Sequence, residues 1–269
     1  MIPIRDNIPS HSKPYVTWAL MAINTLIFLV TLILPEASIR NIMFLYGMVS
    51  YRYSHPEWAY ETGFPDDAYL SFLTNMFLHG GWFHLIMNMI FMWIFADNIE
   101  DRFGHGRFLI FYLFCGILAS ISQFYFMPEL VVPVVGASGA IAGVMGAYFM
   151  LYPYARIVLW VPFFIPIFFE IPAIAFLGLW VIIQLHEATT SIVAEPSFIN
   201  VAWWAHIGGF VFGIVFLKIF TLLPRTGFSN QVRRSTLRRT SHRLQVIRPF
   251  GREEDPHLYG TITITPHES

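Results

Sequence analysis

The chain has 269 residues, of which 56% are hydrophobic and only 12% are charged, and its formal net charge is -1. Typical soluble domains are about 45–50% apolar and about 25% charged, so the composition excludes an ordinary soluble globular protein and indicates a chain that lies in a bilayer. The charges gather in connecting segments and in the C-terminal region, as burial of several helices in hydrocarbon requires. The only cysteine, Cys115, lies in an apolar stretch, which excludes an intramolecular disulfide and predicts a small core residue.

The N-terminal part predicts a polar leader and then a membrane span. A membrane helix needs about 20 mainly apolar residues, and the first such run begins at Tyr15. It has no small-x-small cleavage site, so we expect a retained span and not a signal peptide. Residues 36–78 then mix charged residues with aromatic patches. This combination predicts a structured loop that partly enters the membrane surface.

Three prolines divide a later apolar stretch. Pro162, Pro166 and Pro172 interrupt residues 158–184, with Glu170 among them. Because a carboxylate in hydrocarbon is costly, we expect an interfacial or extended connection up to Glu170. The fifth helix is then predicted to begin at Pro172, which suits a first helical turn.

The predicted fold is an all-α membrane protein with six membrane-spanning helices. It has a leader (residues 1–14), a membrane domain (residues 15–223) and a basic tail (residues 224–269). The predicted spans are residues 15–34, 82–96, 108–126, 136–152, 172–188 and 201–223. Six spans place both termini on one side, and the basic residues on that side assign it to the cytoplasm. The short leader and the compact plan fit a bacterial inner membrane.

The tail contains the basic run Arg233-Arg234-Ser235-Thr236-Leu237-Arg238-Arg239. Such a run can bind anionic lipid head groups at about 1 kcal/mol per basic residue, and a solvated segment that sets the topology explains it equally well. No aromatic residues are interleaved and no nucleic-acid-binding module is recognisable. We therefore expect the lipid bilayer, and no nucleic acid, among the partners.

A serine among glycines heads the fourth span. Ser138 lies between Gly136, Gly139 and Gly143, which allow a second backbone to approach closely. Taken alone, such a serine is explained by helix packing. The sixth span carries His206 on the same face as two further glycines, at i+3 and i+7. A histidine on one close-packing face and a serine on another predict a Ser138–His206 pair.

The second span carries His84 and Asn88 at i and i+4 on one face. An unpaired polar group in hydrocarbon costs several kcal/mol, so each is either satisfied locally or functional. His79 precedes this span and is predicted to end the long loop. Metal ligation by these histidines and His206 is the competing interpretation. The chain has no His-Glu-x-x-His motif and no carboxylate beside them, so we expect no metal.

Together these motifs resemble the rhomboid intramembrane serine proteases, in order, spacing and placement, over roughly residues 70–215. The motifs that carry the resemblance are Gly136-Ala137-Ser138-Gly139, Ala205-His206 with Gly209 and Gly213, and His84-x-x-x-Asn88. Glu100 with Gly104, a plausible helix stop, resembles a structural element of that family.

The resemblance implies a six-helix rhomboid-type bundle and a catalytic dyad without a third carboxylate. Ser138 would be the nucleophile and His206 the general base and acid. The oxyanion donors would be the side chains of Asn88 and His84 and the backbone N–H of Ser138. No cofactor is implied, and the substrates would be single-span membrane proteins. His79 would support the first long loop.

Two positions depart from the pattern of the family. Many relatives have Trp-Arg where this chain has Leu70-Ser71, which leaves open how the first loop is anchored. Some relatives also carry an aromatic residue four positions after the serine, packed on the histidine. Ala142 stands at that position, so another residue must orient His206.

Three functions compete for this sequence. The leading hypothesis is an intramembrane serine endopeptidase that cleaves in or next to transmembrane segments. The alternative is a catalytically silent rhomboid-fold protein that binds or escorts membrane clients. Such proteins usually lose the serine or the histidine, and this chain keeps both. A channel or proton-linked transporter ranks third, because inverted repeats and a series of intramembrane carboxylates are absent from the sequence. The oligomeric state is left open.

Overall fold

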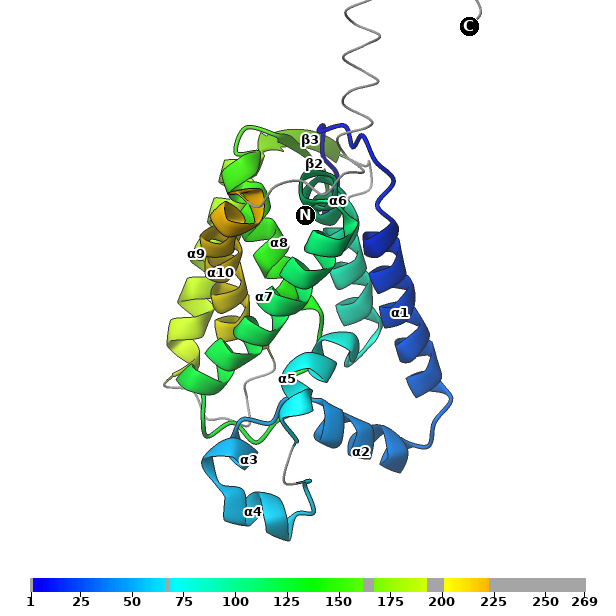
Figure 1. Ribbon diagram of the computed structural model, residues 1–269, viewed down its shortest axis with the longest axis vertical. Helices are drawn as coiled ribbons and strands as arrows, with labels where there is room; N and C mark the ends of the chain where they lie inside the picture. Colours follow the sequence, from blue (N-terminus) through cyan, green and yellow to red (C-terminus); the bar gives the residue numbers. More distant parts are fainter. Residues whose placement is uncertain (1, 66–67, 162–166, 193–200, 223–269) are drawn as a thin grey trace, which may run out of the picture. The chain divides into compact units, whose positions relative to one another are not determined.

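Long apolar helices fill most of the computed structural model, which describes residues 2–65, 68–161, 167–192 and 201–222 (Figure 1). In this part of the chain, five helices are long and apolar enough to cross a membrane, where six spans were predicted. These five are α1 (Tyr15–Leu32), α6 (Trp82–Phe103), α7 (His105–Phe126), α9 (Ala173–Ser191) and α10 (Trp203–Leu222). The remaining apolar helix, α8 (Ser138–Leu151), has only 14 residues. It packs against α6, α7 and α10, so it lies inside the bundle.

α6 extends past the predicted apolar span and ends at Gly104, the predicted helix stop. The second span was expected to stop at residue 96, whereas α6 continues to Phe103. Its last turns remain helical because Glu100 and Asp101 accept hydrogen bonds from the segment that precedes and begins α1. Gly104 then ends the helix with a φ of 83°, a backbone conformation that favours glycine. The predicted basic tail, residues 224–269, lies outside the described residues.

The all-α prediction needs one correction, because three strands form an antiparallel sheet in the order β1-β2-β3. The strands are β1 (Ile2–Arg5), β2 (Arg156–Val161) and β3 (Ile167–Pro172). The expected extended connection is therefore two paired strands, with Ile157 opposite Ile171. Both strands are rich in β-branched and aromatic residues, which favour strands. The leader joins the same sheet through the pairing of Ile2 with Trp160, which sequence reasoning did not predict.

The segment between α1 and α6 contains a series of short helices. They are α2 (Glu36–Tyr46), α3 (Tyr51–Ser54), α4 (Pro56–Glu61), the 3-10 helix η1 (Ala68–Leu70), α5 (Ser71–Thr74) and the 3-10 helix η2 (Asn75–Phe77). In Figure 1 these helices extend from the end of the bundle opposite the sheet. The entry of this segment into the membrane surface stays a prediction.

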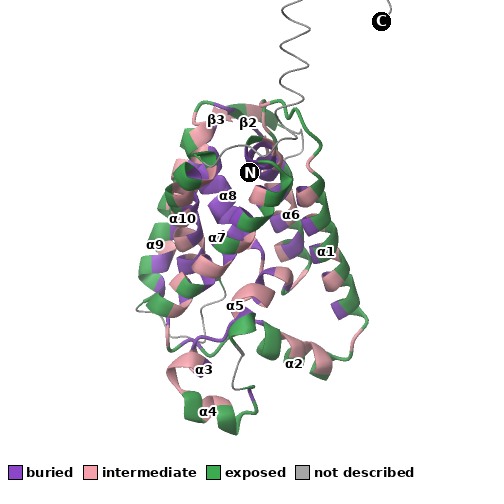
Figure 2. Cartoon of the chain, viewed as in Figure 1, coloured by how far each residue is buried: buried purple, intermediate pink, exposed green. Residues whose placement is uncertain are grey.

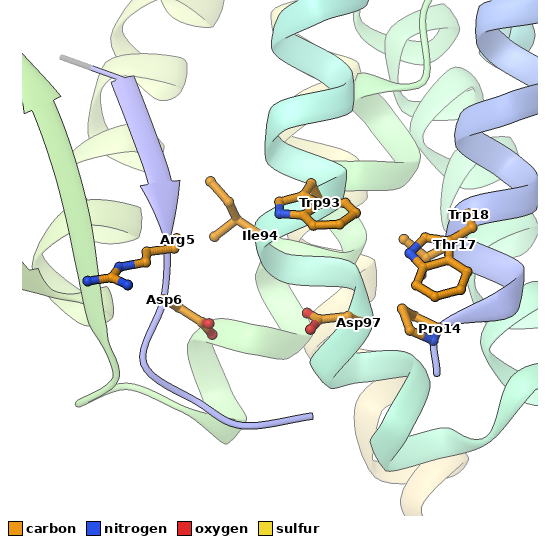
Figure 3. Close-up of a pocket in the computed structure, with 8 residues that line it drawn as sticks. All are labelled: Arg5, Asp6, Pro14, Thr17, Trp18, Trp93, Ile94 and Asp97. Atoms are coloured by element: carbon orange, nitrogen blue, oxygen red, sulfur yellow. The ribbon is translucent and has the colours of Figure 1, made fainter. Parts of the chain in front are cut away.

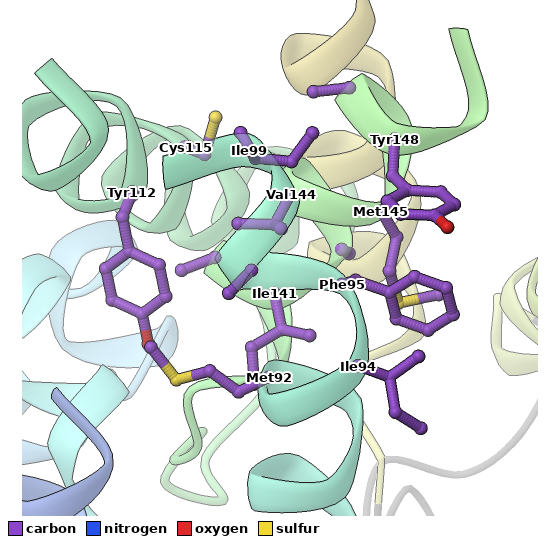
Figure 4. Packing of buried hydrophobic residues seen from close by; sticks show 14 of the residues in the cluster. Met92, Ile94, Phe95, Ile99, Tyr112, Cys115, Ile141, Val144, Met145 and Tyr148 are labelled. Atoms are coloured by element: carbon purple, nitrogen blue, oxygen red, sulfur yellow. The ribbon is translucent and has the colours of Figure 1, made fainter. Parts of the chain in front are cut away.

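The core lies where α6, α7 and α8 face one another (Figure 2). Figure 4 shows the side chains that fill it, among them Phe95 of α6, Tyr112 of α7 and Met145 of α8. Cys115 is fully buried in the same cluster, which confirms its prediction as a core residue.

Glycines bring α8 and α10 into backbone contact. A Cβ atom added at Gly209 would lie 2.0 Å from the carbonyl oxygen of Gly139, and one at Gly213 would lie 1.9 Å from that of Gly143. Both distances are far below van der Waals contact, so only glycine fits at these positions in α10. The expected close approach at the serine is therefore present, and α10 is the helix that makes it.

The buried carboxylate of Glu100 joins α1 to α6. It accepts hydrogen bonds from the backbone N–H groups of Val16 and Thr17 at 2.9 and 2.8 Å and from the Thr17 hydroxyl at 2.7 Å. It also contacts His105 Nδ1 at 2.5 Å. The first N–H groups of a helix have no partner inside it, and a negative charge there is favourable. Glu100 gives the first N–H groups of α1 a hydrogen-bond acceptor and places a negative charge beside them.

We expect Glu100→Ala to lower the free energy of unfolding by about 2–4 kcal/mol, because it leaves several buried donors unpaired. The measurement is thermal or denaturant unfolding of the purified protein in detergent. Glu36→Ala is the matched control, since Glu36 pairs with Arg40 on the surface, with 85% of its side chain exposed. It should change stability by at most about 0.5 kcal/mol. Equal stability of the two variants would contradict the assigned role.

Candidate active site

Ser138 is the first residue of α8. Hydrogen bonds fix the position of the segment that precedes it. Gly136, two residues earlier, has a φ of 127° and donates its N–H to the Asn75 carbonyl at 2.9 Å. Val134 and Met48 exchange two backbone hydrogen bonds, which tie this segment to the first loop. Because helix N-termini present free N–H groups and partial positive charge, Ser138 stands where developing negative charge is stabilised.

His206 lies in the first turn of α10 and contacts this serine. Its Nε2 atom is 2.7 Å from Ser138 Oγ, and both residues are half-buried. The backbone N–H of the neighbouring Ala205 donates to Oε1 of the buried Gln123 on α7 at 3.2 Å, which holds the start of α10. The structure therefore brings together the serine and the histidine that the sequence analysis paired.

His84 and Asn88 of α6 border the segment that leads into Ser138. A Cβ atom at Gly136 would lie 2.6 Å from Nε2 of His84 and 3.7 Å from Nδ2 of Asn88. Asn88 is 5% exposed, and its Nδ2 atom has no hydrogen-bond partner among the described residues. A buried amide donor without a partner is costly, so it is a group that a ligand oxygen would satisfy.

His79 lies just before α6 and behind this pair. It is 2% exposed, and its ring centroid is 5.2 Å from that of His84. Burial lowers the pKa of His79 to about 4, so the ring is neutral at pH 7. A neutral, enclosed imidazole agrees with its expected place at the end of the long loop and supplies no charge to the site.

Sequence reasoning missed the partner on the other side of His206. Nδ1 of His206 is 2.7 Å from Oε1 of Gln184, a buried residue of α9. Trp180, one turn earlier on α9, has its ring centroid 5.9 Å from that of His206, and Trp203 lies at 6.0 Å. Trp180 and Trp203 thus place aromatic rings beside His206, although Ala142 provides none. A polar amide within an apolar span was the available signal.

The first loop is anchored by an arginine at an unexpected position. Arg52 of α3 is 4% exposed and donates to the carbonyls of Phe44 and Leu45 at 3.4 Å. It also donates to the Tyr53 hydroxyl, which in turn shares a hydrogen bond with Ser71. Arg52 thus supplies a buried cation beside the Leu70-Ser71 position, where many relatives have Trp-Arg.

A cavity of about 230 Å³ lies elsewhere, between β1, α1 and α6 (Figure 3). Asp6 and Asp97 point toward each other across it, and both accept from the Asn98 amide, at 3.1 and 2.9 Å. Burial raises the pKa of Asp6. None of the four candidate site residues lines this cavity. Within the described ranges, no three His, Cys, Asp or Glu side chains come together as metal ligands.

The chain is similar in sequence to known proteins of one family. Residues 66–223 match the family model described as Rhomboid domain. The chain is 29% identical over 152 residues to Rhomboid protein 1, mitochondrial, of Saccharomyces cerevisiae, which covers 55% of this chain and 40% of that protein. It is 45% identical over 75 residues to Rhomboid protease GluP of Bacillus subtilis, covering 28% and 14%. It is 27% identical over 179 residues to Rhomboid-like protein 11, chloroplastic, of Arabidopsis thaliana, covering 63% and 59%. The matched segments therefore span less than two thirds of these relatives.

Proposed function

The chain belongs to the rhomboid family of integral membrane proteins, and from this we propose that it is an intramembrane serine endopeptidase. One observation carries the proposal, the 2.7 Å contact between Ser138 Oγ and His206 Nε2 at the N-terminus of α8. A nucleophile and a base at hydrogen-bond distance are what covalent catalysis requires. One of the relatives, Rhomboid protease GluP, is named as a protease, which supports the same reaction class.

The reaction follows from this pair. His206 Nε2 takes the proton of Ser138 as Oγ attacks the carbonyl carbon of a peptide bond. The tetrahedral intermediate collapses when the C–N bond breaks and His206 gives its proton to the leaving amine. The same nitrogen then deprotonates a water molecule, which attacks the acyl carbon, and gives this proton to Ser138 Oγ as the C–O bond of the acyl-enzyme breaks. No step requires a metal or a cofactor.

The negative charge on the carbonyl oxygen is held by donors fixed in advance. We assign this role to the side chains of Asn88 and His84 and to the backbone N–H of Ser138. The proposal is supported by the unpaired, buried Nδ2 of Asn88 and by the proximity of both side chains to Gly136. Donors that are already oriented need no reorganisation when charge develops, which is why they lower the barrier.

The substrates are single-span membrane proteins, cut in or next to the membrane segment. A helical backbone keeps its carbonyls in hydrogen bonds, so the substrate must unwind locally before Ser138 can attack. We therefore expect Gly, Ser or Pro near the cleaved bond. The proposed topology has six spans within residues 15–223, with both termini and the basic tail in the cytoplasm of a bacterium.

The test is cleavage of a model single-span protein by the purified enzyme in lipid vesicles. We expect two fragments whose masses sum to that of the substrate plus one water, with the cut at the membrane segment. Substrate that stays bound and uncut would overturn the proposal and favour an escort that binds membrane clients. Fragments cut only at sites far from the membrane segment of the substrate would overturn the intramembrane assignment.

Asn88→Ala should lower kcat by about 10²–10³-fold, because one donor to the oxyanion is lost. KM should change little, since the oxyanion forms only after substrate binding, in the tetrahedral intermediate and the transition states beside it. The rates are measured in the vesicle assay. The matched control is Asn24→Ala, an intramembrane asparagine of α1 whose amide bonds to Leu20 of its own helix. If Asn88→Ala retained the rate of the control, Asn88 would have no part in the oxyanion site.

A further inference from the structure

The imidazole of His206 is held on both sides. Nε2 faces Ser138 Oγ at 2.7 Å, and Nδ1 faces Oε1 of Gln184 at the same distance. Serine, histidine and glutamine come from three different helices, α8, α10 and α9. Gln184 is 5% exposed, so this contact is sheltered from exchange with water.

The chemistry of the two ring nitrogens gives this contact a direction. A neutral imidazole carries one N–H proton. Nε2 can accept the proton of the serine only if the imidazole's own proton is on Nδ1. An amide oxygen accepts and cannot donate, so Oε1 of Gln184 stabilises the tautomer with the proton on Nδ1. The opposite amide orientation would favour a proton on Nε2, which would prevent His206 from acting as a base.

The type of residue also suits its depth in the protein. Serine proteases in water commonly use a carboxylate at the corresponding position. A carboxylate within a membrane helix is costly, whereas an amide accepts the same hydrogen bond without a charge. Trp180 lies one turn from Gln184 on the same face of α9, and its ring borders the imidazole at a centroid distance of 5.9 Å. One face of α9 therefore contacts the His206 imidazole through both Gln184 and Trp180, and this contact takes the place of an aromatic residue at position 142.

We propose that Gln184 is a positioning residue that holds Nδ1–H of His206, so that the site operates as a Ser138–His206–Gln184 triad. This proposal rests on the proposed protease function. It makes α9 part of the catalytic machinery, because a displacement of α9 would break the bond that sets the tautomer of His206.

The first test is kinetic. Gln184→Leu should lower kcat by about 10–100-fold with little change in KM, since substrate does not contact this side of the ring. Gln184→Glu should restore the acceptor and keep kcat within about threefold of wild type. It should also move the acidic limb of the kcat–pH profile to higher pH, because a carboxylate favours the imidazolium. His84, the other titratable side chain near the pair, is the same in every variant. Thr190→Ala is the matched control, because Thr190 is an exposed α9 residue whose hydroxyl donates to the Glu187 carbonyl of the same helix.

A purely structural role would give a different pattern. Gln184→Leu would then lower the thermal stability, and the pH profile of Gln184→Glu would match that of wild type. Either an unchanged kcat in Gln184→Leu or an unmoved pH profile in Gln184→Glu overturns the triad. Absence of cleavage by wild type, in contrast, overturns the protease function itself.

A second measurement does not depend on activity. Nitrogen-15 NMR of labelled histidine distinguishes the two tautomers, and the His206 signal is assigned by its loss in His206→Ala. We expect the proton on Nδ1 in wild type and a mixture of tautomers in Gln184→Leu. A proton on Nε2 in wild type, or the same spectrum in both proteins, would overturn the proposal even for an inactive preparation.

Discussion

Replacement of Ser138 by alanine should reduce cleavage of a single-span substrate by about 10⁴-fold or more. The variant lacks Ser138 Oγ, the atom that attacks the carbonyl carbon. Only the residual rate enhancement from the oxyanion donors and from substrate binding then remains. Substrate binding should persist, because the remaining site is unchanged. The measurement is the cleavage rate in lipid vesicles under single-turnover conditions, with thermal stability recorded alongside.

Ser122→Ala is the matched control for this prediction. Ser122 is also an intramembrane serine, but its hydroxyl bonds to the Leu118 carbonyl of its own helix, at 2.9 Å. It should retain wild-type cleavage within about twofold. Cleavage that survives in Ser138→Ala, at the level of this control, would end the assignment of the nucleophile.

Gly213→Ala should have the largest effect on stability, with a loss of about 3 kcal/mol or more. The added Cβ would lie 1.9 Å from the Gly143 carbonyl oxygen and 2.8 Å from its Cα. Backbone atoms cannot rotate away as a side chain can, so α8 and α10 must separate. Ser138 and His206 lie on these two helices, so the separation should abolish cleavage as well. Thermal unfolding in detergent and the vesicle assay measure both effects.

Gly178→Ala on α9 is the control for Gly213→Ala. It separates the steric clash of the added Cβ from the effect of replacing any helical glycine by alanine. A Cβ atom at Gly178 meets nothing within 4 Å, so the variant should be neutral or slightly stabilised by the higher helix propensity of alanine. Equal behaviour of the two variants would show that the backbone contact between α8 and α10 does not limit stability.

The features that the sequence predicted well are those that one helix encodes by itself. Apolar length gave the long helices, and the i, i+3 and i+7 spacing in α10 placed His206 on the glycine face that meets α8. The pairing of β1 was missed for the opposite reason. β1 lies far from β2 in the sequence, as the pairing of Ile2 with Trp160 shows, and no local pattern indicates such a partner.

The same distinction holds within the candidate site. Gln184 reaches His206 across 22 residues, and its role depends on how α9 lies beside α10. Arg52 lies outside the family motifs, and it anchors the first loop by donating hydrogen bonds to the carbonyls of Phe44 and Leu45. Gln184 was visible in the sequence as a polar residue in an apolar span, whereas Arg52 stands in a segment that mixes charged and aromatic residues. Only the fold supplies their partners.

Covalent labelling by a fluorophosphonate tests the central claim most directly, because it reports the nucleophile without requiring the natural substrate. An activated serine oxygen displaces fluoride and forms a bond to phosphorus, and mass spectrometry of the digested protein locates the adduct. The account predicts one adduct, on Ser138, absent from Ser138→Ala and formed at least about 100-fold more slowly in His206→Ala. An adduct on another serine, or equal labelling of wild type and His206→Ala, would contradict it.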